Sequence, residues 1–447
     1  MTSPRRNSFW PLLIVWAAVF AVWTPSLSGS FLKDDESNFL ANPVVRSPAR
    51  WPTFFYVKSA NSRDRELTVA YRPLATLSYA ATARLAGFNA FFFHLIDIAG
   101  HAANAALVLL IGLELCGSLP AAAAGAVLFA FHPAQAESVS YVSGARPSVF
   151  ALLFCLLALR EHAKGRRPRA LTLFAVAALF KESALGLPFA LAAWDWAGPS
   201  RKTLKEVARG TAPYFAFAAC FAALRGVVLV HTTDSGLYGG KLASHIGFAL
   251  AGLAVHARST VWPYGQRLCY TLTDPAGWAL GTAGALILAA LVFLFICGLR
   301  GRRPWMVGLA WAAAFLLPVS NIIPVSSLAA DRYLYASFAG LAWLVALAAS
   351  RPPKRRSWLA AAALAVWLAP LCLERQWDWQ SAFNIDLANH RASEDACASA
   401  VLIIDYYNWG MDDRARALVR EGLARRPCPT VRAYLNRVDR MLRPGFK

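Results

Sequence analysis

Charged residues are scarce in this chain. Asp, Glu, Lys and Arg make up 16% of its 447 residues, whereas a soluble domain usually contains about a quarter. Hydrophobic residues reach 57%, and the mean hydropathy is +0.42. These values exclude an ordinary soluble domain and favour a protein that crosses a membrane many times.

Several functional signatures are missing as well. The chain has no Gly-rich phosphate-binding loop, and its basic loops are too short to hold a nucleotide-sugar domain. Its cysteines and histidines lack the spacing of a structural zinc site. We therefore expect neither a soluble nucleotide sugar as substrate nor a structural zinc ion. A Mg²⁺ or Mn²⁺ held by acidic side chains stays an alternative.

Apolar runs that could cross a bilayer core of about 30 Å recur along the chain. They predict an all-α integral membrane protein with about eleven transmembrane helices. The run at 245–262 does not fit the alternation of crossings and predicts an interfacial or re-entrant helix. The first run could be a signal peptide, but its Trp-rich core favours a retained anchor. The seven longer runs are 9–27, 91–113, 147–162, 211–230, 276–299, 333–350 and 357–373, and the four shorter ones are 119–132, 169–181, 184–197 and 304–318.

The net charge of +20 is distributed on one side of the predicted bundle. Alternate loops contain 18 Lys and Arg residues against three acids, Glu114, Glu161 and Glu206. By the positive-inside rule these loops and the N-terminus are cytoplasmic, so no nucleic-acid partner is expected. The first long loop, 28–90, and the tail, 374–447, then lie on the outer face. The basic loops are 1–8, 114–118, 160–170, 198–210, 300–303 and 351–356.

Polar residues gather in the loops that this topology puts on the outer face. Randomly placed anchors would populate both faces, so the one-sided distribution predicts a site at the outer interface. For Asp34 and Asp35 the alternative is a solvated acidic turn that caps a helix at 36–40. The candidates are Asp34, Asp35, Arg72, Glu137, Arg146, Lys181, Glu182, Asp331 and Arg332.

The second predicted span contains ionisable residues, which are costly inside a bilayer. His94, Asp97, His101 and Asn104 fall on one helical stripe. The stripe spreads them over about 15 Å, so at most an adjacent pair such as Asp97 and His101 could share a metal ion. Hydrogen bonds between helices are the alternative and the simpler interpretation. Similarly, Glu137 could pair with Arg146.

Two cysteines lie in the predicted outer tail, which is an oxidising location. Cys397 and Cys428 flank a predicted helical hairpin. We expect a disulfide between them. The remaining cysteines lie mostly in apolar runs, where they are expected to be small buried hydrophobic residues.

Five motifs occur in an order that resembles one family. They are "DDESNFLANP", "YRPLATLSYA" leading to "FFFHLIDIAGHAANAALVLL", "HPAQAESVSYVSGARPSVFALLF", "KESALGLPFALAAWDW" and "NIIPVSSLAADRYLYASFAG". This order resembles the polytopic C-type (GT-C) glycosyltransferases, in particular the transmembrane and tetratricopeptide-repeat O-mannosyltransferases and their bacterial relatives. The resemblance covers most of residues 28–345.

The resemblance implies a GT-C-like bundle that moves a sugar from a polyprenyl-phosphate carrier to an acceptor hydroxyl outside the cytoplasm, with inversion. It implies that Asp34 or Asp35 is the general base. A lipid phosphate is already a good leaving group and needs positive charge more than an acid, so Arg332, Arg72 and Lys181 are the expected phosphate-binding residues. The partners would be membrane lipid, the lipid-linked sugar and a protein or glycolipid acceptor. The Ala- and Arg-rich composition points to a bacterial inner membrane, with the active site and the C-terminus in the periplasm.

The sequence departs from the resemblance in three ways. The tail has room for about one helical hairpin and a last helix, whereas a repeat solenoid needs about three repeats. Position 97 is Asp where relatives are expected to have Asn. The segment "GARPS" replaces a glycine-arginine-acid run, which removes an acid near Arg146. These changes leave the acceptor and donor open, while the domains are expected at 1–373 (glycosyltransferase) and 374–447 (a repeat-like remnant).

Two other functions compete with protein O-mannosylation. A transferase that acts on a glycolipid or on lipid A would need no repeats, which the short tail favours. A secondary transporter would also have buried polar stripes and broken helices. Transporters of that kind contain two similar halves, however, and the chain has no second copy of "YRPL", "HP" or "DRYLY".

Overall fold

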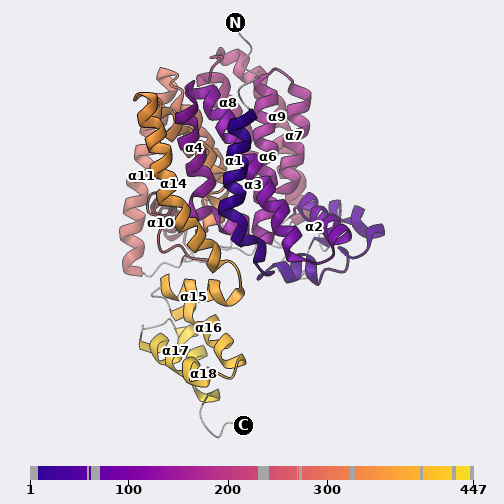
Figure 1. The fold of residues 1–447 in the computed structure, drawn as a ribbon, viewed down its shortest axis with the longest axis vertical. Helices are drawn as coiled ribbons and strands as arrows, with labels where there is room; N and C mark the ends of the chain where they lie inside the picture. The colour runs from indigo at the N-terminus through magenta and orange to yellow at the C-terminus, as the bar shows by residue number, and fades with distance from the viewer. Residues whose placement is uncertain are drawn as a thin grey trace.

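The computed structural model describes residues 9–57, 60–61, 71–229, 241–268, 270, 274–322, 328–392, 396–424 and 429–442. Throughout these ranges the ordered elements are helices, and none is a strand. Every one of the eleven predicted crossings corresponds to a helix of an upright bundle (Figure 1). These helices are α1 (Phe9–Trp23), α3 (Ala90–Cys116), α4 (Leu119–Phe131), α6 (Val142–Ala163), α7 (Arg167–Phe180), α8 (Leu187–Ala197), α9 (Leu204–Leu229), α11 (Asp274–Gly301), α12 (Trp305–Leu316), α13 (Ser337–Ala349) and α14 (Lys354–Asp378).

Six helical stretches in the described residues are long and apolar enough to cross a membrane. The most exposed of these stretches is in α11, where only 6% of the apolar segment is buried within the protein. Trp278 is 84% exposed and Phe293 66% exposed on this helix. Large apolar side chains in such numbers need a lipid surface around them, so the chain is an integral membrane protein. The six stretches are Trp10–Ser28, Ala90–Cys116, Val142–Ala163, Leu204–Gly226, Gly277–Gly301 and Lys354–Asp378.

The two ends of the bundle differ in what they carry. At one end lies the start of α1 together with the basic loops at 160–170, 198–210, 300–303 and 351–356 (Figure 1). We call it the basic end. At the opposite end lie the long first loop, with helix α2 (Pro73–Ala86), and the C-terminal helices (Figure 1). We call it the tail end.

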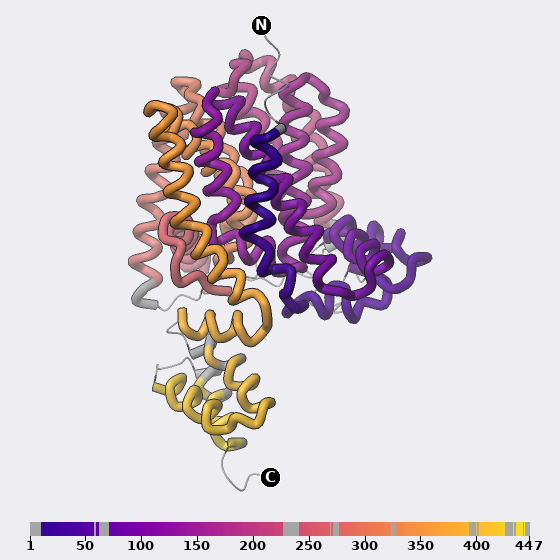
Figure 2. Tube along the Cα trace, viewed as in Figure 1, coloured from indigo at the N-terminus to yellow at the C-terminus, as the bar shows by residue number. Residues whose placement is uncertain are grey.

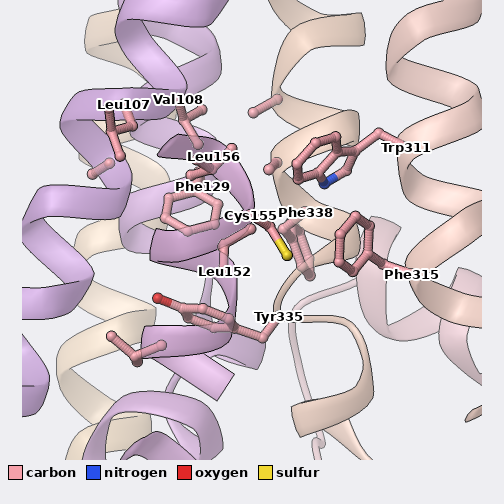
Figure 3. Packing of buried hydrophobic residues seen from close by; sticks show 14 of the residues in the cluster. Leu107, Val108, Phe129, Leu152, Cys155, Leu156, Trp311, Phe315, Tyr335 and Phe338 are labelled. Carbon is pink, nitrogen blue, oxygen red and sulfur yellow. The ribbon is translucent and has the colours of Figure 1, made fainter. Parts of the chain in front are cut away.

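Close helix crossings at glycine hold the bundle together. Helices α12 and α13 meet at Gly308 and Gly340, where a Cβ on Gly340 would lie 2.3 Å from the Gly308 carbonyl oxygen. No larger residue could replace either glycine without separating the helices. Beside this crossing, Trp311 packs edge-to-face on Trp343 with ring centroids 4.9 Å apart. Figure 3 shows the neighbouring core, in which Trp311, Phe315 and Phe338 face Leu152 and Cys155 of α6.

Helix α10 (Leu242–Val261) covers the run at 245–262 that was predicted to be an interfacial or re-entrant helix. It packs closely on α11, where a Cβ on Gly284 would clash with the Leu250 carbonyl oxygen. Its last turn is bound at the tail end, because His132 Nε2 lies 3.1 Å from the Thr260 carbonyl oxygen. His132 itself follows the tail end of α4.

Two predicted helix starts were wrong by several residues. Helix α6 begins at Val142, and Pro147 lies inside it rather than at its start. Pro147 has no N–H to donate to the Ser143 carbonyl oxygen four residues earlier, so α6 lacks one internal hydrogen bond in its second turn. Helix α13 begins at Ser337, whereas Asp331–Tyr333 form a separate 3₁₀ turn, η9.

The tail consists of four short helices below the bundle (Figure 1). Helices α16 and α17 form the expected hairpin, α18 is the expected last helix, and α15 precedes them. Ile403, Val419 and Leu435 are buried together in a small core between three of these helices. The four are α15 (Ala382–Ala392), α16 (Ala396–Asn408), α17 (Asp412–Ala424) and α18 (Pro429–Met441).

Candidate active site

The two adjacent acids at the start of the first loop have different environments. Asp35 is 1% exposed, and its carboxylate accepts hydrogen bonds from the backbone N–H of Leu32 and of Ser143, both at 2.8 Å. Burial raises the pKa of Asp35 to about 7, although the two N–H groups act in the opposite direction. Asp35 makes no side-chain cap of the following π-helix, η2 (Glu36–Leu40). The acid therefore joins the loop to α6 and is not a simple helix cap.

Asp34 is exposed. Its backbone N–H donates to the Tyr141 hydroxyl at 3.1 Å, and the Tyr141 ring stacks on Trp379 with centroids 5.6 Å apart. Asp35 is thus enclosed by protein, while the carboxylate of Asp34 is accessible. Of the two acids, only Asp34 can contact a bound substrate without a rearrangement of the loop.

The segment 137–143 connects the acids with a basic group. Glu137, in the short helix α5 (Glu137–Ser140), is 1% exposed and forms an ion pair with Nη1 of Arg332. Its other oxygen accepts the backbone N–H of Arg332 at 2.9 Å. Burial opposes the charged form of Arg332, but the Glu137 carboxylate outweighs this effect and raises the pKa of Arg332. Arg332 therefore remains a fixed cation.

A hollow at the tail end is lined by basic and apolar side chains. Lys181 and Arg332 contribute the positive charge, and Nζ of Lys181 donates to Ser148 Oγ at 2.8 Å. Leu152, Phe315 and Tyr335, which form part of its apolar wall, lie near one another in Figure 3. The hollow is small and opens to the surface. The lining residues are Ser148, Ala151, Leu152, Lys181, Ser183, Phe315, Val319, Arg332, Tyr333, Tyr335 and Ala336.

Arg72 is held beside this hollow by a two-pronged ion pair. Its Nε and Nη2 donate to the two carboxylate oxygens of Glu182 at 3.0 and 2.7 Å. Burial raises the pKa of Glu182, but the Arg72 charge outweighs this and keeps it below the usual value. Glu182 is the neighbour of Lys181 at the start of η6 (Glu182–Gly186), so the structure brings all three predicted phosphate-binding residues to the same region.

Asp331 lies next to Arg332 but faces a different group of residues. Its Oδ1 accepts from the Tyr270 hydroxyl at 2.8 Å, and its Oδ2 lies 4.0 Å from Nη2 of Arg375. Burial raises the pKa of Asp331 to about 7, opposed by the charge of Arg375. Asp331 therefore links the turn η9 to α14 and to the segment before α11.

The alternative that Glu137 pairs with Arg146 is wrong, because each has another partner. Arg146 forms an ion pair with Asp97 in the bundle interior, where the two side chains are 1% and 0% exposed. It also donates to Thr82 Oγ1 and to the Phe93 carbonyl oxygen, both at 3.2 Å. Two departures from the family resemblance are therefore connected. The sequence lacks the expected acid next to Arg146, and Asp97 provides the acidic partner instead.

The polar stripe on α3 does not converge on a metal site. His101 Nδ1 lies 2.9 Å from the Tyr335 hydroxyl and its Nε2 lies 3.1 Å from the Ala130 carbonyl oxygen. His94 is buried beside Gly29. No group of three potential metal ligands occurs in the described part of the chain. The stripe mainly makes the hydrogen bonds between helices that were the simpler interpretation.

Some residues of this region were not among the predicted candidates. Tyr141 and Ser143 bind the loop of the acids, while Tyr270 and Arg375 surround Asp331. Tyr141 and Ser143 lie within a quoted motif and could have been noticed there. Arg375 carried no signal beyond a charge at the end of a span. The predicted disulfide concerns Cys397 and Cys428, and the Cys397 side chain and all of Cys428 lie outside the described residues.

Comparisons with known proteins agree with the motif resemblance. No family model matches the chain. It is 35% identical to the protein O-mannosyl-transferase TMTC1 of Mus musculus over 151 residues, which are 31% of this chain and 15% of that protein. It is 24% identical to the protein O-mannosyl-transferase TMTC3 of Mus musculus over 85% of this chain and 47% of that protein. The chain is therefore a relative of the protein O-mannosyl-transferases that matches less than half of their length.

One solved structure is also similar. It is the crystal structure of ArnT from Cupriavidus metallidurans bound to undecaprenyl phosphate. The TM-score is 0.43 and the sequence identity 14%, over 88% of this chain and 80% of that one.

Proposed function

We propose that this protein is a glycosyltransferase that moves a sugar from a polyprenyl-phosphate carrier to an acceptor hydroxyl at the tail end of the bundle. One observation carries the proposal: the segment 137–143 connects the accessible acid Asp34 to Arg332, which lines a hollow together with Lys181. An acid that accepts a proton and cations that bind a phosphate are the two groups this reaction needs. The names of the sequence relatives support the same class.

In the proposed mechanism Asp34 is the general base. Its carboxylate takes the proton of the acceptor hydroxyl as the acceptor oxygen forms a bond to C1 of the sugar. The bond between C1 and the phosphate oxygen breaks on the opposite side, so the configuration at C1 is inverted. The departing polyprenyl phosphate takes the bonding electrons, and positive side chains stabilise its charge.

Arg332 is the best placed cation for that phosphate. Only Nη1 of its guanidinium is used in the ion pair with Glu137, which leaves the remaining donors for phosphate oxygens. Lys181 adds a second cation at the hollow and Arg72 a third beside it. Asp35, with both oxygens engaged by N–H groups, positions the loop and does not react.

The proposal extends to organisation and location. Residues 1–373 form the glycosyltransferase domain and 374–447 a small repeat-like tail. The N-terminus lies in the cytoplasm of a bacterium, and the tail end faces the periplasm from the inner membrane, as the basic loops favour. The acceptor is a protein hydroxyl, by analogy with the sequence relatives. A glycolipid acceptor is the second candidate, favoured by the short tail.

The test uses the full chain in nanodiscs with radiolabelled undecaprenyl-phosphate mannose, glucose and aminoarabinose, and a bacterial membrane extract as acceptor. Release of undecaprenyl phosphate with label in the protein fraction would support protein glycosylation. Label in the lipid fraction would move the acceptor to a glycolipid. Parallel reactions with EDTA, with and without added Mg²⁺ or Mn²⁺, test the metal alternative. Absence of transfer from every donor, with uptake of solute into proteoliposomes, would overturn the proposal in favour of a transporter.

A further inference from the structure

Lys33, the residue before the two acids, has a backbone conformation that few side chains adopt. Its φ is +47°, in the left-handed region that glycine, asparagine and aspartate tolerate best. A lysine stays there only where its surroundings hold it. The conformation turns the chain between Leu32 and Asp34, so it sets the orientation of the two acids that follow.

The surroundings that hold Lys33 come from the C-terminal tail. Its Nζ lies 2.9 and 2.7 Å from the two carboxylate oxygens of Asp386 in α15. Three residues earlier in the loop, the N–H and the hydroxyl of Ser30 both donate to the Gln380 carbonyl oxygen at 2.9 Å. Figure 2 shows this meeting of the chain after α1, in indigo, with the orange turn between α14 and α15.

A third contact reaches Asp34 itself. Trp379, at the end of α14, stacks on Tyr141, and the Tyr141 hydroxyl accepts the N–H of Asp34. Residues about 350 positions later in the sequence therefore contact the segment from Ser30 to Lys33, which leads into the two acids.

We infer that the tail is part of the active site and that Asp386 is a positioning residue, which holds Lys33 in its left-handed conformation and thereby presents Asp34 to the acceptor. This inference rests on the proposed function.

The pair differs from an ordinary surface ion pair. The Asp386 side chain is 6% exposed and engages Lys33 with both oxygens, whereas an exposed single contact contributes little. The tail offers such a contact as a matched control. Arg416 Nη1 lies 3.7 Å from Asp413 Oδ1, and Asp413 is fully exposed.

The test compares full-length variants in nanodiscs with undecaprenyl-phosphate mannose, or whichever lipid-linked sugar of the panel the wild type uses. Asp386→Asn is expected to lower kcat at least 10-fold with a donor KM within twofold of wild type, while Asp413→Asn has no effect. The exchanged pair Lys33→Asp with Asp386→Lys is expected to regain most of the activity, because aspartate tolerates a positive φ. Lys33→Gly should retain more activity than Lys33→Ala, since glycine adopts this φ without the ion pair.

Hydrogen exchange of residues 30–40 provides a readout independent of catalysis. Asp386→Asn should speed exchange in this segment, while Asp413→Asn leaves it unchanged. Equal kcat for Asp386→Asn and wild type would overturn the inference and leave the proposed function standing. A failure of the exchanged pair to regain any activity, with Lys33→Gly no better than Lys33→Ala, would also overturn it. Absence of transfer by the wild type would overturn the proposed function first and this inference with it.

Discussion

The two ends of the bundle contain the same kinds of polar residue in different states of pairing. At the basic end Asp195 is 0% exposed, and its two oxygens lie 3.0 Å from His162 Nε2 and 2.6 Å from Lys202 Nζ. The other nitrogen of His162 lies 3.1 Å from the Tyr214 hydroxyl. Both oxygens of Asp195 and both nitrogens of His162 are thus engaged by a neighbour, as expected of a group that fixes helices in place.

The tail end leaves charges available. Asp34 is exposed, and Arg332 lines an open hollow with Lys181. Asp331 has one oxygen whose nearest cation is 4.0 Å away. A buried acid by itself therefore does not mark a site. What distinguishes the tail end is accessible charge next to fixed charge.

The largest effect should come from the accessible acid. Asp34→Asn is expected to lower the transfer rate by about 10²–10⁴, the usual contribution of a general base, without changing thermal stability. Single-turnover transfer of labelled sugar measures the rate. Glu36→Gln removes another exposed acid two residues away and is the control. If both variants lost activity equally, the loop would need its charge in general and not a base at position 34.

Arg332 should have the next largest effect. Arg332→Met is expected to lower kcat by about 10²-fold, as for removal of a donor that stabilises developing charge. It should also destabilise the protein, because Glu137 is 1% exposed and would lose its partner. Arg332→Lys keeps the charge and should retain more of the activity. Kinetics with the lipid-linked donor and thermal unfolding separate the two effects, and full activity in Arg332→Met would remove Arg332 from the phosphate site.

The pH dependence should show the difference between the two acids of the loop. Asp35 accepts two N–H bonds only as a carboxylate, and burial raises its pKa to about 7. Transfer should therefore be fastest above pH 7 and fall as the pH drops through this value and Asp35 gains a proton. The Asp35→Asn variant should be slower and should lack this inflection. An unchanged inflection in that variant would assign it to another group.

The smallest effect on turnover is expected at the basic end. Asp195→Asn weakens the contacts to His162 and Lys202, so the free energy of unfolding should fall by about 1–3 kcal/mol, while kcat per folded enzyme stays within about twofold. Thermal unfolding in nanodiscs and active-site-normalised kinetics give the two quantities. A large loss of kcat with unchanged stability would show that the basic end contributes to the reaction, and the contrast between the ends would fail.

The membrane bundle, its helix order and the grouping of polar residues at one end could be predicted from the amino-acid sequence alone. These properties depend on local signals, since an apolar run is long enough to span a bilayer whatever its neighbours are. The eleven predicted crossings agree with the helices, although the starts of α6 and α13 were shifted by several residues. The candidates Asp34, Arg332 and Lys181 were likewise identified from motifs.

The pairing of these residues, in contrast, depends on how the helices pack. The sequence could not show that Glu137 pairs with Arg332, that Asp97 replaces the acid expected near Arg146, or that Asp35 is buried while Asp34 is exposed. Nor could it join Lys33 to Asp386 across 353 residues. Such pairs depend on the rotation and packing of helices distant in sequence, which hydrophobic periodicity alone does not fix.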